Sequence, residues 1–151
     1  PKVRCITGVD ISDAALNLSS TTCKHLQNVM FIKDDCTNLK IPANQFDLVW
    51  SQGLIEHFDN PEVLIKEHIR ICKPGKTILI SVPYKYSYMT PWYLLTRPKI
   101  TRFLWPWTNQ IMFTPGLFFK LIKKIDYPAG NCAVYKKNPF LGIIIFRIIK
   151  K

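Results

Sequence analysis

The 151 residues are 48% hydrophobic and 21% charged, which excludes a disordered or low-complexity chain and predicts one domain with a substantial core over residues 1–151. The longest apolar run, residues 140–146, is far shorter than the roughly 20 residues that a membrane-spanning helix needs, so we expect no such helix. The net charge of +11 lies almost wholly in the second half: residues 1–75 hold 8 Lys/Arg and 9 Asp/Glu, whereas residues 76–151 hold 13 Lys/Arg and one acid.

The first half of the chain alternates short apolar runs with helix signals. A helix is expected to begin after the cap Ser12-Asp13, and a second after Asn60-Pro61, with Lys73-Pro74-Gly75 at its end. Strands that alternate with helices in this way predict an α/β fold with a parallel sheet and right-handed crossover helices. The predicted strands of this half are residues 3–9, 29–32, 46–50 and 77–82.

The second half is less regular. Residues 83–113 carry several Trp and Tyr rings among four prolines, which forbid one long helix. A helix is predicted to restart after Thr114-Pro115 and to run to Lys124, and a strand follows over residues 131–136. The closing stretch, residues 139–151, fits either a last strand or an amphipathic helix.

The cysteines are scattered and never form a Cys-x-x-Cys pair. A disulfide framework or a structural zinc site would space them differently, so we expect reduced thiols in a cytoplasmic protein. They are Cys5, Cys23, Cys36, Cys72 and Cys132.

Polar residues follow the predicted strands at the edge where open parallel sheets bind ligands. Asp10 ends the first strand and can accept hydrogen bonds from both hydroxyls of a ribose, while Ile11 can lie against an adenine face. Asp35 follows the second strand and can accept from an adenine amino group, while the backbone around Cys36 can pair with a ring nitrogen. Two acids at neighbouring strand ends therefore predict an adenosine pocket. Taken singly, Asp10 also fits a helix cap and Asp35 a turn.

Four segments share one order and spacing, and a fifth follows them as Phe113-Thr114-Pro115. The four are Gly8-Val9-Asp10-Ile11-Ser12; Asp35-Cys36-Thr37-Asn38-Leu39 with Pro42; Phe46-Asp47-Leu48-Val49-Trp50-Ser51, running on to Ile55-Glu56-His57; and Ile71-Cys72-Lys73-Pro74-Gly75. In this combination residues 6–82 resemble the class I S-adenosylmethionine-dependent methyltransferases, in their small-molecule branch. The resemblance implies a Rossmann-like, doubly wound, mostly parallel sheet with flanking helices.

The resemblance also implies a cofactor, S-adenosylmethionine, and the residues that would bind it. Asp10 would hold the ribose, and Ile11, Asp35 and Cys36 would contact the adenine. Ser51 and Gln52 would lie near the methionine part and the departing methyl group.

Two further residues match a helix-start pair near the pocket mouth of the family. His57 would act as a base for the proton of the methyl acceptor, and Glu56 would orient it. In some relatives that bind magnesium, a glutamate stands where this chain has Gly53, so no metal is expected. His25 and His68 fall on predicted helix surfaces and receive no role.

The chain departs from the family at its start. The family begins with a strand and a glycine-rich loop some 15–20 residues before the ribose acid, on the usual spacing of the two motifs. Here nine residues precede Asp10, and Gly8 stands alone among them. The resemblance therefore implies an N-terminally incomplete fold, either a fragment of a longer protein or a shortened relative.

The basic, aromatic second half predicts an anionic partner. Residues 1–82 would be the cofactor-binding half, residues 83–113 a substrate-covering insert, and residues 114–151 a C-terminal helix with strands. Tyr and Trp beside Lys and Arg suit the surface of an anionic membrane, with residues 84–113 and 140–151 as the contact. Single-stranded nucleic acid ranks behind the membrane, and for any single ring core packing ranks first.

Two hypotheses follow for the function. The first is an S-adenosylmethionine-dependent methyltransferase domain, which transfers a methyl group to a small, lipid-like acceptor in the cytoplasm or at a membrane. The second is a non-catalytic remnant that binds a membrane or a partner. A dinucleotide-dependent oxidoreductase would use the same ribose acid, but it needs a glycine fingerprint, and the Ile55-Glu56-His57 segment argues against it.

Overall fold

The computed structural model describes residues 3–87, 90–91 and 110–151, and the chain divides into two compact units, Pro1–Pro42 (unit 1) and Ala43–Lys151 (unit 2). Most of the predicted aromatic insert, with its Trp92, Trp105 and Trp107, lies outside the described residues. The division into a cofactor half, an insert and a C-terminal part stays a prediction.

Unit 1 is a β-α-β arrangement. It contains β1 (Ile6–Asp10), α1 (Asp13–Thr22) and β2 (Val29–Lys33), and the two strands pair in parallel from Ile6↔Val29 to Asp10↔Lys33. The side chain of Ser12 caps α1 by accepting a hydrogen bond from the backbone N–H of Ala15 at 3.3 Å, as the sequence predicts.

A glycine allows the two strands of unit 1 to pack closely. Gly8 lies opposite Phe31 in the β1–β2 register, and a Cβ at this position would stand 2.6 Å from the ring atom Cδ1 of Phe31. A side chain at residue 8 would therefore displace the ring.

Unit 2 is a mixed sheet with helices. Its strands run in the order β3-β4-β6-β5; β3 and β4 are parallel, whereas β6 pairs antiparallel with both β4 and β5. Its elements are β3 (Phe46–Gln52), η1 (Ile55–His57), α2 (Pro61–Ile71), β4 (Cys72–Pro83), α4 (Pro115–Lys124), η3 (Ala129–Asn131), β5 (Cys132–Asn138) and β6 (Ile143–Ile149). The predicted α/β fold, with parallel pairing in the first half of the chain, is confirmed.

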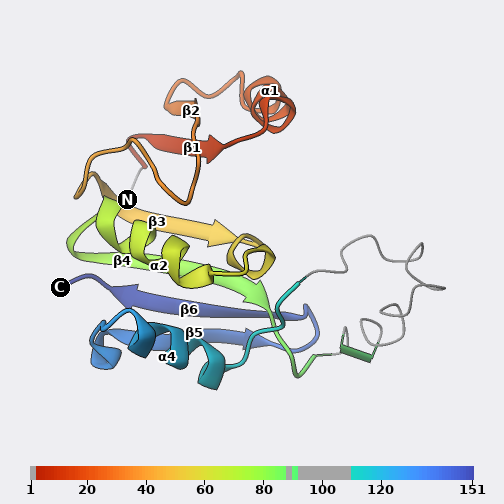
Figure 1. The fold of residues 1–151 in the computed structure, drawn as a ribbon. Helices are drawn as coiled ribbons and strands as arrows, with labels where there is room; N and C mark the ends of the chain where they lie inside the picture. The colour runs from red at the N-terminus through yellow and green to blue at the C-terminus, as the bar shows by residue number, and fades with distance from the viewer. Residues whose placement is uncertain (1–2, 88–89, 92–109) are drawn as a thin grey trace. The chain divides into compact units, whose positions relative to one another are not determined.

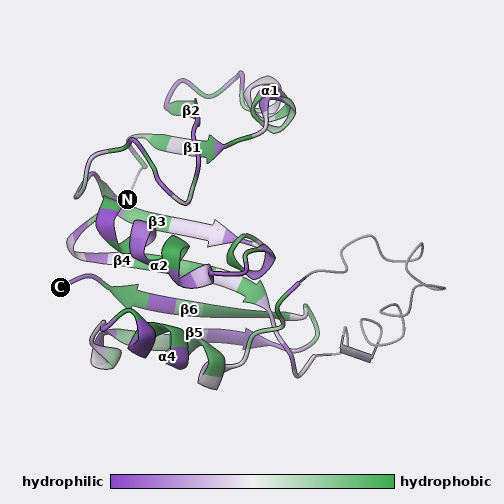
Figure 2. Ribbon diagram, in the orientation of Figure 1, coloured by the Kyte–Doolittle hydropathy of each residue, from purple (hydrophilic) through white to green (hydrophobic). Residues whose placement is uncertain are grey.

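The core of unit 2 lies between its sheet and its two long helices. Figure 1 shows α2 against β3 and β4, and α4 against β6 and β5, on the same face of the sheet. Phe118 of α4 stacks on Phe146 of β6 with ring centroids 3.9 Å apart, and both side chains are fully buried. The hydropathy of these elements agrees with this packing. Figure 2 shows that β6 is almost continuously hydrophobic, whereas α4 alternates between hydrophobic and hydrophilic residues.

The helix signals place α2 and α4 correctly, with two differences at α2. Asn60 occupies the N-cap position, but its side chain makes no capping hydrogen bond. The helix ends at Ile71, and residues 73–75 already belong to β4, where Gly75 takes the positive φ of 73° that favours glycine. At α4, the helix restarts at Pro115 and runs to Lys124, and Thr114 caps it by accepting from the N–H of Leu117 at 3.1 Å.

The expectation that His68 lies on a helix surface is wrong. Its side chain is 7% exposed, and its Nδ1 lies 2.6 Å from the carbonyl oxygen of Leu64. The reason is the helical period: Leu64, Ile65, His68 and Ile71 share the buried stripe of α2. Burial lowers the pKa of His68, so the ring is neutral near pH 7.

The alternatives for residues 139–151 are resolved in favour of a strand. Ile144, Phe146 and Ile148 of β6 are fully buried, and within this stretch Phe140 and Leu141 remain exposed, at 86% and 64%. In the part of the chain that the structure describes, no helix is long and apolar enough to span a bilayer.

Candidate functional site

Unit 1 brings Asp10 and Asp35 to the same edge of its sheet. The two strands are parallel, so their carboxyl ends coincide, and the backbone N–H of Asp34 donates to the carbonyl oxygen of Asp10 at 3.2 Å. The predicted neighbourhood of the two acids is therefore present, at the edge where parallel sheets bind ligands.

Each of the two acids uses one carboxylate oxygen locally. Oδ1 of Asp10 accepts from the N–H of Ser12 at 2.8 Å. Oδ1 of Asp35 accepts from the N–H and the hydroxyl of Thr37, both at 2.8 Å, and these bonds hold the pKa of Asp35 below its usual 3.8. Among the described residues, Oδ2 of each acid has no hydrogen-bond partner. Both acids thus act in turns and still keep an oxygen free for a ligand.

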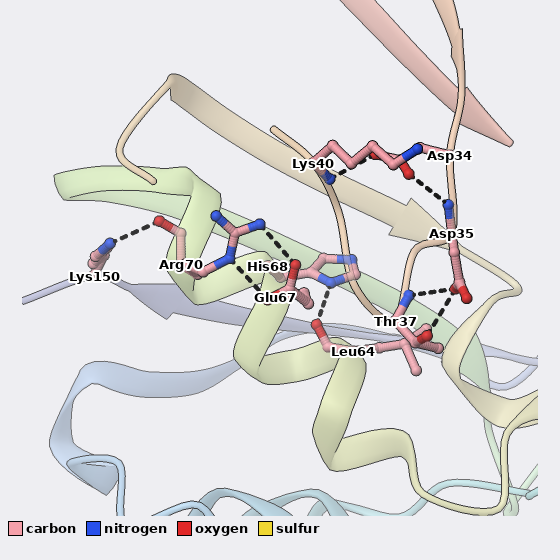
Figure 3. A network of polar contacts seen from close by, with 9 residues as sticks. All are labelled: Asp34, Asp35, Thr37, Lys40, Leu64, Glu67, His68, Arg70 and Lys150. Atoms are coloured by element: carbon pink, nitrogen blue, oxygen red, sulfur yellow. Dashed lines mark hydrogen bonds and ion pairs between the residues drawn. The ribbon is translucent and has the colours of Figure 1, made fainter. Parts of the chain in front are cut away.

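The neighbouring Asp34, for which the sequence predicted no role, organises the loop that carries Asp35. It is 8% exposed, its Oδ1 accepts from the N–H of Asp35 at 3.0 Å, and its Oδ2 accepts from the N–H of Lys40 at 2.7 Å (Figure 3). The acidic pair was visible in the sequence, but nothing in it showed which acid turns inward.

The other two predicted residues of unit 1 differ in exposure. Ile11 is 66% exposed, so its side chain is available to a flat ring. Cys36 is half-buried, and burial together with the charge of Asp35 raises the pKa of its thiol, which keeps the thiol protonated. Two unbonded carboxylate oxygens, which accept hydrogen bonds, and an exposed apolar side chain fit the hydroxyls, the amino group and the ring of a nucleoside.

Unit 2 has a cavity at the carboxyl ends of β3 and β4. It measures about 130 Å³ and opens where Gln52 and Ser81 pair across the two strands. Its lining residues come from β3, η1, β4 and the start of β6: Gln52, Gly53, Glu56, Ser81, Val82, Pro83, Gly142 and Ile143.

Glu56 is the acid of this cavity. It is 2% exposed, and among the described residues its Oε2 is buried without a hydrogen-bond partner. Burial raises the pKa of Glu56 to about 6 from its ordinary 4.5. Gly53, with φ +63°, ends β3 in a turn that leaves 3.5 Å between a Cβ at this position and Oε1 of Glu56. The turn therefore brings the carboxyl close to the strand end.

The other predicted residues of unit 2 are spread over different environments. Ser51 is buried, and its hydroxyl oxygen has no hydrogen-bond partner among the described residues, whereas Gln52 is exposed and lines the cavity. His57 is exposed, and no hydrogen bond joins its ring to Glu56, although both residues are described. Of the predicted catalytic pair, the buried Glu56 reaches the cavity.

The structure supplies no cluster of metal ligands within residues 3–87, 90–91 and 110–151. All five cysteines are free thiols, and burial raises the pKa of Cys132 to about 11. This thiol is therefore unreactive at neutral pH.

Comparison with known proteins adds a family and several relatives. The family model described as "Methyltransferase domain" matches residues 2–80. The demethylmenaquinone methyltransferase of Staphylococcus haemolyticus is 31% identical over 74 residues, which are 49% of this chain and 31% of that protein. The ubiquinone biosynthesis O-methyltransferase of Coxiella burnetii is 29% identical over 77 residues, 50% of this chain and 33% of that protein. The chain thus spans about a third of the length of these curated relatives.

The fold recurs in a solved structure. A SAM-dependent methyltransferase of Thermotoga maritima superimposes with a TM-score of 0.72 at 18% identity, over 97% of this chain and 73% of that chain. At this identity the likeness shows the fold alone, and it confirms the predicted Rossmann-like architecture.

Proposed function

Because the chain belongs to the methyltransferase domain family, we propose that the protein transfers a methyl group from S-adenosylmethionine to a small, lipid-like acceptor. The observation that carries this proposal is the juxtaposition of Asp10 and Asp35, each with a carboxylate oxygen left for a ligand. The lipid-like acceptor rests on the activities for which the relatives are named, which concern menaquinone and ubiquinone.

The residues of unit 1 would bind the nucleoside part of the cofactor. Asp10 would accept hydrogen bonds from the ribose hydroxyls, Asp35 would accept one from the adenine amino group, and Ile11 would cover the ring. The backbone around Cys36 would pair with a ring nitrogen. When bound, S-adenosylmethionine supplies a methyl group on a positively charged sulfur.

The residues of unit 2 would serve the reacting groups. Ser51 and Gln52 would lie near the methionine part and the methyl group. His57 or Glu56 would take the proton of the acceptor, and the exposure of His57 leaves it free to move towards a ligand, whereas Glu56 is fixed.

Calorimetric titration with S-adenosylhomocysteine tests the proposal, on this chain and on any longer natural form of it. We expect Asp10→Asn to weaken binding about tenfold, because hydrogen bonds to charged groups are stronger than neutral ones. Asp13→Asn, three residues away and exposed, is the matched control and should bind like the wild type. Failure of every form to bind would favour the non-catalytic remnant.

A second part of the proposal is contact with an anionic membrane. Phe140 and Leu141 are the exposed apolar residues of the β5–β6 turn, and Lys136 and Lys137 of β5 are exposed beside it. This surface is a narrower candidate than residues 140–151 as a whole, because β6 lies inside the sheet. Apolar side chains flanked by lysines suit a headgroup interface. Nucleic acid stays the lesser alternative, and a cytoplasmic location stays a prediction.

Co-sedimentation with vesicles of phosphatidylserine and phosphatidylcholine tests this contact. Binding should fall when Phe140 and Leu141 are both changed to Ser, and it should weaken as salt rises because surface charges are screened. Leu18→Ser removes an equally exposed apolar side chain in unit 1 and serves as the control. Absence of binding by the wild type at low salt would remove the membrane from the proposal.

A further inference from the structure

The cavity of unit 2 combines one acidic group with apolar walls. Glu56 contributes the carboxyl, Gln52 and Ser81 contribute neutral polar groups, and Val82, Pro83 and Ile143 contribute hydrophobic surface. Cavities of roughly 150 Å³ in other proteins hold a benzene molecule. The volume of about 130 Å³ therefore suits a group no larger than one small ring.

The buried carboxyl of Glu56 has an oxygen without the hydrogen-bond partner that buried polar atoms normally have. Polar atoms that are shielded from water are almost always hydrogen-bonded, and each exception calls for an explanation. Oε2 of Glu56 is such an exception among the described residues, in a side chain that is 2% exposed. Within the described part of the chain no basic side chain lines the cavity, and burial raises the pKa of Glu56.

The missing partner has a defined chemistry. A carboxylate accepts hydrogen bonds, so the ligand has to bring a donor, and the apolar walls favour a donor attached to a flat hydrophobic group. A metal ion would need further oxygen or nitrogen ligands, and no group of three such side chains occurs among the described residues. A hydroxyl brings a single hydrogen for the single free oxygen.

We propose, resting on the function above, that this cavity is the subsite for the hydroxyl-bearing ring of the methyl acceptor, with Oε2 of Glu56 accepting the hydrogen bond from that hydroxyl. The acceptor is then a phenol-like compound that is methylated at the phenolic oxygen or at a ring carbon next to the carbon that carries this oxygen. Glu56 binds the substrate directly in this assignment, and it does not act through His57.

Nuclear magnetic resonance titration of the full chain with phenol, anisole and benzylamine tests the assignment at neutral pH. Anisole has the same ring without the hydroxyl hydrogen. The amide signals of Gly53 and Gly142, which line the cavity, report where each compound binds. We expect phenol to bind about tenfold more tightly than anisole, the usual worth of a hydrogen bond to a charged group.

The variant Glu56→Gln keeps the shape of the side chain but offers a weaker acceptor, so the preference for phenol should fall by about threefold or more. Glu62→Gln is the matched control, because Glu62 pairs with Lys124 outside the cavity, and it should keep the preference. Equal binding of phenol and anisole by the wild type would overturn the assignment even if the variant fails to fold. Tighter binding of benzylamine, or shifts confined to residues away from the cavity, would overturn it as well.

Titration of the same sample with S-adenosylhomocysteine separates this inference from the proposed function. Cofactor binding without a preference for phenol would overturn the hydroxyl subsite and leave the methyltransferase proposal intact. A preference for phenol without cofactor binding would support the subsite and count against the proposed methyl transfer.

Discussion

The two units differ in what stabilises them. Every buried hydrophobic side chain among the described residues lies in unit 2, between Val49 and Ile148, whereas the buried residue of unit 1 is Asp34. Two strands with one helix bury too little to be stable alone. Unit 1, which carries the acids proposed to bind the nucleoside, therefore has no buried apolar core of its own among its described residues, whereas unit 2, which carries the cavity, has one. The contrast shows that sequence signals can predict strands and helices correctly even in a region that has no buried core.

The largest test of this contrast removes part of the core. Phe146→Ala should lower the free energy of unfolding by about 3–5 kcal/mol, because the ring is fully buried against Phe118 and leaves a cavity. Denaturant unfolding measures the change. Phe140→Ala removes the same side chain from an 86% exposed position and should have almost no effect. Equal losses in the two variants would contradict the assigned core.

The second test uses pH and the buried acid of unit 2. Glu56 has a folded-state pKa of about 6, above its ordinary 4.5, so the folded state binds more protons between these values. Its contribution to stability is therefore fully present below pH 4.5 and is lost as pH rises through 6. The wild type should lose about 2 kcal/mol relative to Glu56→Gln between pH 4.5 and 7. A constant difference between the two proteins across this range would refute the raised pKa.

The third test addresses unit 1. Gly8→Ala places a Cβ against the ring of Phe31 and should cost about 1 kcal/mol, the lower end for overpacking because the ring is half-exposed and can turn. Hydrogen exchange of the β1 and β2 amides should quicken accordingly. Gly130→Ala, where nothing lies within 4 Å of the new Cβ, is the control. Unchanged exchange in Gly8→Ala would show that the two strands are looser than described.

The smallest effect is expected from the surface ion pairs of two acids, one acid in each unit. Asp13 pairs with Lys33 in unit 1, and Asp47 pairs with Lys73 at 2.9 Å and Lys76 at 3.3 Å in unit 2, all of them solvent-exposed. Asp13→Asn and Asp47→Asn should leave the unfolding midpoint almost unchanged, since such pairs are weak and screened by salt. A marked fall of the unfolding midpoint in either variant would mean that surface charge, and not burial, accounts for the difference between the two units.

The sequence predicted the local structure well because its signals are local. The cap at Ser12, the helix start near Pro115, the apolar run of β4 and the acids at the ends of β1 and β2 are all readable within a few residues. Burial depends on packing between distant segments, so the sequence predicted the burial of individual side chains wrongly or not at all. It placed His68 on the surface, gave Asp34 no role, and did not show that Glu56 is buried.

The placement of β6 has a consequence for how the protein is made. The strand nearest the end of the sequence lies between β4 and β5, and it hydrogen-bonds to both. A nascent chain leaves the ribosome from its N-terminus, so β4 and β5 emerge without a common neighbour and wait for residues 143–149. Loss of residues 143–149 would therefore harm more than one strand, because it would leave edges of both β4 and β5 unpaired and open to aggregation.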